Sequence, residues 1–220
     1  MTVMTIVCDE CHARDRGYRS RPRSLAHPMH YRIPLFLALS LATGLASAAA
    51  AADEATCRDI SFPRHVQVSG SDLTLNGLGV RKATFLKINV YVAAYYVAQP
   101  SHDPKPLIES DTPQQLTLQF VRNVGVDDLR KAFVEGFERV KASGLDERVA
   151  RLNGWMTDMK SGQRLTFVRV PHSGVQITVN GVQKGVIEGA DFARALISIW
   201  LGATPPNPEL KTGMLGGECG

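Results

Sequence analysis

The sequence has little of what most enzyme and metal sites require. Its 220 residues include only four cysteines and six histidines. The three histidines after residue 52, His65, His102 and His172, are far apart in the chain. No Gly-x-Ser-x-Gly elbow and no glycine-rich loop with a phosphate-binding lysine occurs. These absences argue against a serine hydrolase and a nucleotide-binding enzyme, and we expect no cofactor and no metal site.

A concentrated positive charge is also lacking in the main body of the chain. The formal net charge is +4, but several of the arginines lie in the first 32 residues. After residue 52 no basic stripe interleaved with aromatic residues is present. We therefore expect no nucleic-acid partner.

No hydrophobic run is long enough for a permanent membrane helix. Residues 33–46 form an apolar run of about 14 residues, shorter than the roughly 20 that span a bilayer. A basic start at residues 29–32 precedes the run, and Ala46-Ser47-Ala48 follows it as a small-residue cleavage site. Residues 29–52 therefore predict a signal peptide, a periplasmic or secreted protein, and no stable membrane anchor after cleavage. A retained membrane helix is the alternative.

Residues 1–28 do not fit this organisation, because a signal peptide begins at the N-terminus. We expect them either to precede the true initiator, Met29, or to be disordered, which leaves residues 53–220 as one domain. Two cysteines remain in that domain, Cys57 and Cys219, near its two ends. In an oxidising compartment they are a possible disulfide, and two unpaired thiols are the alternative.

Alternating apolar and polar residues predict an antiparallel sheet. The run at residues 90–98 is apolar on both parities, which is typical of a strand covered on both faces. Asn76-Gly77 and Asn180-Gly181 predict turns. The predicted strands are residues 65–68, 73–75, 80–88, 90–98, 116–121, 165–170, 175–179 and 186–187.

Apolar residues at helical spacing predict helices at residues 126–141, 146–159 and 189–202, with a turn of helix near residue 107 and a polar tail after residue 208. The sum is an α+β domain, in which a sheet of six or seven antiparallel strands carries a helical layer on one face. An apolar cleft between the two layers is the default place for a small-molecule site.

Arg81 is the most informative residue, because it stands among residues that predict buried sheet. Its strand parity is that of Ala83 and points to the apolar side. An arginine keeps its charge in a protein, so the buried guanidinium needs an anionic partner. That partner is either a bound ligand or an acidic side chain of the same chain. Tyr91 can donate a second hydrogen bond beside it, with Tyr95 and Tyr96 as alternatives, although an aromatic residue in a strand is more often part of the core.

Three segments resemble the bacterial exported branch of the chalcone isomerase-like family. They are Asn76-Gly-Leu-Gly-Val-Arg81, Lys87-Ile-Asn-Val-Tyr91-Val-Ala-Ala-Tyr-Tyr96 and Ile199-Trp-Leu-Gly-Ala-Thr-Pro-Pro-Asn-Pro-Glu-Leu-Lys211. The resemblance covers residues 60–216 and implies an open-faced β-sandwich, a large antiparallel sheet covered by helices with a ligand cleft between them.

The resemblance also implies two activities. Plant chalcone isomerases close a chalcone to a flavanone, whereas non-catalytic relatives bind fatty acids through an arginine and a tyrosine, which fall on Arg81 and Tyr91. The enzymes carry a tyrosine and an asparagine at the start of the helix matching residues 126–141. This chain has neither residue type between Asn123 and Asn153, and it has Tyr91 where the enzymes have threonine.

The leading hypothesis is therefore periplasmic, non-catalytic binding of a fatty acid or similar amphiphilic carboxylate by Arg81, Tyr91 and Tyr95. The second is an isomerase or lyase acting on a phenolic enone, in which Arg81 polarises the substrate oxygen. The third is an interaction module without a ligand, in which Arg81 makes an internal ion pair.

Overall fold

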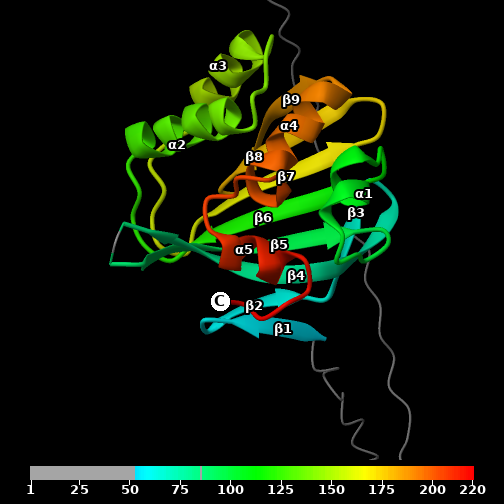
Figure 1. Ribbon diagram of the computed structural model, residues 1–220, viewed down its shortest axis with the longest axis vertical. Coiled ribbons are helices and arrows are strands. Elements are labelled where there is room, and N and C mark those ends of the chain that lie inside the picture. The colour runs from blue at the N-terminus through cyan, green and yellow to red at the C-terminus, as the bar shows by residue number, and fades with distance from the viewer. Residues whose placement is uncertain (1–52, 85) are drawn as a thin grey trace, which may run out of the picture. The chain divides into compact units, whose positions relative to one another are not determined.

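A seven-stranded antiparallel sheet forms the centre of the computed structural model, which describes residues 53–84 and 86–220 (Figure 1). The predicted signal peptide and residues 1–28 lie outside the described residues. The strands follow one another across the sheet in chain order, so each pairs with the next along the chain. The connection from β5 to β6 contains one helix, and the long connection from β6 to β7 contains two. They are β3 (His65–Val68), β4 (Ser71–Ala83), β5 (Ile88–Val97), β6 (Gln114–Phe120), β7 (Arg164–Val170), β8 (Gly174–Val179) and β9 (Val182–Glu188). The predicted α+β architecture is confirmed.

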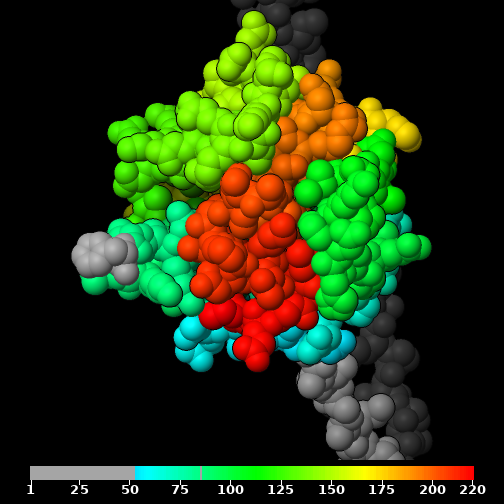
Figure 2. Space-filling view, viewed as in Figure 1, coloured from blue at the N-terminus to red at the C-terminus, as the bar shows by residue number. Residues whose placement is uncertain are grey.

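Helices cover one face of this sheet (Figures 1 and 2). They are α1 (Pro104–Glu109), α2 (Val126–Arg139), α3 (Asp146–Trp155), α4 (Ala190–Leu201) and α5 (Pro208–Met214). The space-filling view shows α4 and α5, coloured orange to red, between α1 in green and the pair α2 and α3 in yellow-green. The side chains of this layer and the sheet face beneath it form the larger hydrophobic core.

Two elements were not predicted. The N-terminal hairpin of β1 (Glu54–Cys57) and β2 (Ile60–Pro63) packs Cys57 and Phe62 into a second core, on the opposite face of the sheet. The segment predicted as a polar tail contains α5, which buries Leu210 and Met214 one turn apart. Both elements are short, and two apolar residues in each are too few for a periodic signal.

Strand β5 is buried on both faces, as its sequence predicts. Tyr91, Ala93 and Tyr95 face the helical layer, whereas Val92 and Tyr96 face the second core. The cover on that second face includes the β1–β2 hairpin. The face that the fold class describes as open is therefore partly closed in this chain.

The predicted turn at Asn76-Gly77 is wrong, because these residues lie inside β4 at an irregularity in its pairing with β5. The Asn76 side chain is buried and fully engaged. Its Nδ2 donates to the carbonyl oxygens of Ser101 and Met214, at 3.1 and 2.8 Å, and its Oδ1 accepts from the amide of Ser101 at 2.7 Å. Asparagine is used here to join three segments rather than to reverse the chain. The following turn comes after Ala83, earlier than the predicted strand at residues 80–88 allows.

The other boundary difference concerns α3, which ends at Trp155 instead of Met159. Met159 instead pairs with Val124 in an isolated antiparallel bridge, with both amide-to-carbonyl hydrogen bonds formed. The bridge joins the segment before α2 to the segment after α3, and so closes the part of the chain that contains both helices. Apolar spacing alone does not separate a helical Met159 from a buried residue just beyond the helix.

Two glycines of β4 allow α5 to lie directly against the strand. A Cβ on Gly77 would collide with the backbone of Gly213, and one on Gly79 would collide with the carbonyl oxygen of Leu210. Any side chain at these positions would therefore push α5 away from the sheet. The glycines of the Gly-Leu-Gly-Val-Arg segment therefore allow α5 to pack closely on β4. This packing also positions the loop before α5.

A disulfide between Cys57 and Cys219 joins β1 to the segment after α5, with a Cα–Cα distance of 5.9 Å and a sequence separation of 162 residues. It therefore links the two ends of the domain. Arg58 beside it donates to the terminal carbonyl of Gly220 through Nε and Nη2, at 3.1 and 2.7 Å.

We expect reduction of this disulfide to lower the free energy of unfolding by about 3 to 5 kcal/mol, because a long loop in the unfolded chain is released. Urea unfolding with and without dithiothreitol measures the difference. The Cys57→Ser/Cys219→Ser variant should unfold at the lower midpoint in both conditions. Equal midpoints for the oxidised and reduced parent would contradict the link.

Candidate ligand-binding cavity

Arg81 and Tyr91 are directly opposite each other on neighbouring strands. They are partners in the antiparallel register of β4 and β5, so their side chains emerge on the same face. That face is the one covered by helices, because Tyr91 belongs to the core beneath the helical layer. Antiparallel pairing thus brings two predicted site residues together, ten positions apart in the chain.

A cavity of about 470 Å³ opens beside this pair. Its floor is formed by the ends of β4, β5 and β6, and its walls by α2, the C-terminal half of α4 and the segment that joins α4 to α5. The lining includes Arg81, Ala83, Val90, Tyr91, Leu118, Phe120, Val124, Leu129, Ala132, Phe133, Ile199, Trp200 and Pro206. Most of these side chains are apolar, so the pair of donors stands at one end of a hydrophobic space.

Arg81 is half-buried and makes only neutral contacts. Its Nη1 donates to the carbonyl oxygen of Lys82 and, at 3.0 Å, to Oδ1 of Asn207. The same Oδ1 accepts from the amide of Lys82 at 2.9 Å. Within the described residues Arg81 has no ion pair, and its Nε and Nη2 make no hydrogen bond. Asn207 fixes the guanidinium but leaves its charge without a counterion.

Tyr91 is held by Trp200, a residue that was not among the predicted site residues. Nε1 of Trp200 donates to the Tyr91 hydroxyl oxygen at 2.9 Å, and both groups are buried. The phenol hydrogen remains available for an acceptor in the cavity. Burial raises the pKa of Tyr91, against the lowering effects of the Trp200 hydrogen bond and the Arg81 charge. At neutral pH Tyr91 is therefore a hydrogen-bond donor.

Two further arginines line the cavity, Arg122 and Arg139. Both are exposed, as are the two acids in the lining, Asp128 and Glu135. Counting Arg81, three positive charges face two negative ones, so an anion is favoured at this end. Arg139 ends α2 and Arg122 follows β6, and their meeting with Arg81 depends on the tertiary fold.

The other two tyrosines of β5 do not line this cavity. Tyr95 lies four residues beyond Tyr91 on β5, beside Arg169, and its buried hydroxyl makes no hydrogen bond in the described part of the chain. Tyr96 points to the second core, where its hydroxyl donates to the carbonyl oxygen of Pro63 at 3.0 Å. The structure therefore brings together Arg81 and Tyr91, and it places Tyr95 elsewhere on the same face.

Within residues 53–84 and 86–220, no group of three histidine, cysteine, aspartate or glutamate side chains is close enough to hold a metal ion. No helix in the same residues has the length and hydropathy of a membrane span.

The family model described as chalcone isomerase-like matches residues 54–216, which include the whole sheet and all five helices. The chain belongs to the chalcone isomerase-like family. Among solved structures, the fatty-acid binding protein AtFAP1 of Arabidopsis thaliana is similar, with a TM-score of 0.62 and 19% identity over 74% of this chain and 95% of that one. At this identity the likeness shows a shared fold. No curated protein sequence matches the chain.

The sheet and the helices are those of the chalcone isomerase-like family. The side chains that line the cavity are set by the sequence of this chain. The helix that bounds the cavity, α2, begins Val-Asp-Asp-Leu. It offers Asp128 to the cavity and contains neither tyrosine nor asparagine.

Burial of the three β5 tyrosines predicts an unusual alkaline titration. Burial raises the pKa of Tyr91 and Tyr95, and raises that of Tyr96 to about 12. Since these folded-state values lie above the unfolded value near 10, their contribution to stability is complete below about pH 10 and is lost as the pH rises above it. Residues 53–220 contain three tyrosines, all on β5, so none should ionise before unfolding.

Phenolate absorbance, followed together with circular dichroism, measures this. In denaturant these three tyrosines should titrate together near pH 10. Phenolate absorbance in a domain with an intact dichroism spectrum would contradict the burial of β5.

Proposed function

We propose that this protein binds a fatty acid or a similar amphiphilic carboxylate in the cavity beside Arg81, without chemical change to the ligand. The observation that carries the proposal is a guanidinium that makes no ion pair with any described residue and stands at the end of a largely apolar cavity. A carboxylate supplies the missing charge, and an aliphatic chain fits the remaining wall. A fatty-acid binding protein with the same fold supports this choice.

The carboxylate head lies against Arg81 and Tyr91. Nε and Nη2 of Arg81 are two donors with the planar geometry that fits a carboxylate, and the Tyr91 hydroxyl adds a third. Both side chains are held in place before binding, Arg81 by Asn207 and Tyr91 by Trp200. A site that is ordered in advance loses less conformational entropy when the ligand binds.

The tail lies between the sheet and α2. A cavity of 470 Å³ holds about 16 groups of the size of water or methylene, at roughly 30 Å³ each. Each buried methylene contributes about 0.8 kcal/mol, close to fourfold in affinity. Affinity therefore rises with chain length until the cavity is full, which this volume places at about 12 to 14 carbons.

The proposed location is the periplasm or the exterior of the cell. The predicted signal peptide at residues 29–52 supports export. The Cys57–Cys219 disulfide agrees with it, because disulfides persist in oxidising compartments.

Binding of dodecanoate tests the proposal. The chain has two tryptophans, so Trp155→Phe leaves Trp200 in the cavity wall as the reporter of fluorescence change. In this background we expect Arg81→Gln to weaken dodecanoate by about 10- to 100-fold, the value of a hydrogen bond to a charged group. Dodecanol, which has the same tail and no charge, should bind both proteins alike.

Arg151→Gln is the matched control, since Arg151 is exposed on α3 and outside the cavity lining. It should leave dodecanoate affinity unchanged. An equal loss for dodecanoate and dodecanol, or an Arg151→Gln effect equal to that of Arg81→Gln, would overturn the assignment of the head group to Arg81.

The second candidate is isomerisation of a phenolic enone, favoured by the two donors that converge on one end of the cavity. Arg81 and Tyr91 together resemble a pair that stabilises a developing oxyanion. If the protein is a binder, 2′-hydroxychalcone should lose absorbance no faster with the protein than in buffer. A rate that exceeds buffer and falls in Arg81→Gln would instead assign the cavity to catalysis.

A further inference from the structure

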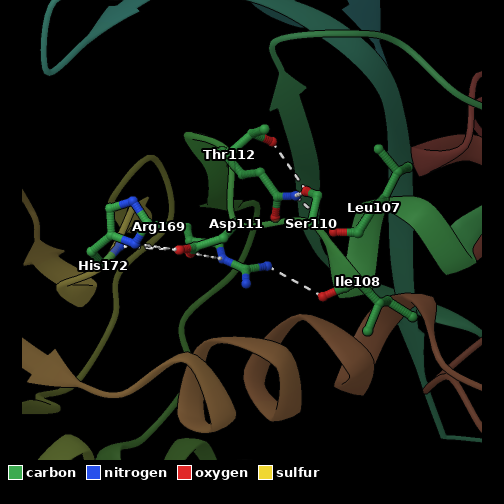
Figure 3. Close-up of polar contacts among 8 residues, drawn as sticks. Leu107, Ile108, Ser110, Asp111, Thr112, Arg169 and His172 are labelled. Carbon is green, nitrogen blue, oxygen red and sulfur yellow. Dashed lines mark hydrogen bonds and ion pairs between the residues drawn. The ribbon is translucent and has the colours of Figure 1, made fainter.

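Arg169 is a second arginine of the sheet that lacks a full set of partners, and it is more deeply buried than Arg81. It lies on β7 with a side chain that is 4% exposed. Its Nη1 donates to the carbonyl oxygen of Ile108 at 3.2 Å, and its Nε is 3.7 Å from Oδ1 of Asp111, beyond hydrogen-bond distance (Figure 3). Nε and Nη2 are buried and make no hydrogen bond among the described residues.

The burial of these two donors without acceptors destabilises the folded state. A buried donor without an acceptor costs about 1 to 3 kcal/mol, and more when it is charged. Burial lowers the pKa of Arg169, and the charge of Arg194 acts in the same direction, against Asp111 and Tyr95. Arginine nevertheless keeps its proton in proteins. An acceptor supplied from outside the chain would relieve this cost.

A separate pocket of about 220 Å³ opens at this guanidinium. It shares no residue with the lining of the Arg81 cavity. Its lining is Asp111, Arg169, Val170, His172, Ser173, Gly174, Ala190 and Ala193. The turn between β7 and β8 thus forms one side of the pocket, and the first turn of α4 forms the other.

The N-terminus of α4 adds a second source of positive potential. Its N-cap, Gly189, has no side chain to accept from the amides of the first turn. The acid of that turn, Asp191, is engaged with Arg148, whose Nη1 and Nη2 lie 2.8 and 2.6 Å from its two carboxylate oxygens. The helix end and the buried guanidinium face one pocket.

The balance of charge around Arg169 remains positive. Asp111 contributes the one carboxylate of the lining, and it is shared with His172, whose Nδ1 lies 3.1 Å from Oδ2. Arg194 on α4 is close enough to act on Arg169 electrostatically. Two arginines therefore stand against one carboxylate.

We propose that this pocket is a binding site for a small oxyanion, such as a free carboxylate or phosphate, held between Nη2 and Nε of Arg169 and the first turn of α4. The volume admits about seven groups of water size, which excludes a long acyl chain. The site is independent of the proposed function, because its residues and its donors are different from those of the Arg81 cavity.

The test is a titration of the ¹⁵N-labelled full chain with sodium phosphate and with sodium acetate, at constant ionic strength balanced by chloride. The Arg81→Gln background removes the main arginine of the other cavity. We expect saturable amide shifts confined to residues 173–174 and 190–193, with the same dissociation constant in the Arg81→Gln and parent proteins. Uniform, unsaturable shifts, or shifts confined to the Arg81 cavity, would overturn the site.

Two variants change affinity in opposite directions. Arg169→Gln should weaken the anion at least tenfold, whereas Asp111→Asn should tighten it about five- to tenfold by removal of a nearby like charge. Arg151→Gln removes the same charge from an exposed residue outside the pocket lining. It should have no effect on the affinity for the anion. If Arg169→Gln does not fold, Asp111→Asn decides alone: unchanged or weaker binding contradicts the proposal, because a purely structural Asp111 would not make an anion bind more tightly.

Discussion

The contact between α5 and β4 is the constraint on which the candidate site depends. The helix can reach the strand because residues 77 and 79 have no side chain, so backbone meets backbone. Asn76 then joins the end of α5 to the strand through the Met214 carbonyl, and the disulfide holds the segment that follows. With α5 in this position, Asn207 at its start lies against Arg81.

The same logic applies to the other half of the site. Tyr91 is opposite Arg81 because of the register of two strands, but its hydroxyl is oriented by Trp200, more than a hundred residues later. Two C-terminal helices therefore each supply one side chain that holds one donor. The cavity is consequently a product of the long-range packing of α4 and α5, and a change that loosens either helix affects the donors before it affects the sheet.

The sequence predicts the parts of this arrangement that repeat along the chain. Strand parity placed Arg81 and Ala83 on one face, and the doubly apolar run of β5 predicted a strand covered on both sides. It does not predict Asn207 or Trp200 as supporting residues, because neither has a signal until the tertiary contact is known. The Asn76-Gly77 pair shows the converse problem, since a sequence typical of a turn is also suited to a bulge in which the amide joins distant segments.

Arg81 and Arg169, two arginines of the sheet, show why burial alone does not define a ligand site. Arg81 is half-buried, keeps Nε and Nη2 free of hydrogen bonds within the described residues, and faces about 470 Å³ of mostly apolar space. Arg169 is almost fully buried, has a carboxylate 3.7 Å away, and faces a space of less than half that volume beside a helix N-terminus. The first environment favours a charged head with a long tail, because the tail replaces water along the apolar wall. The second favours a compact anion, because its volume is too small for a long tail and a buried guanidinium lines it.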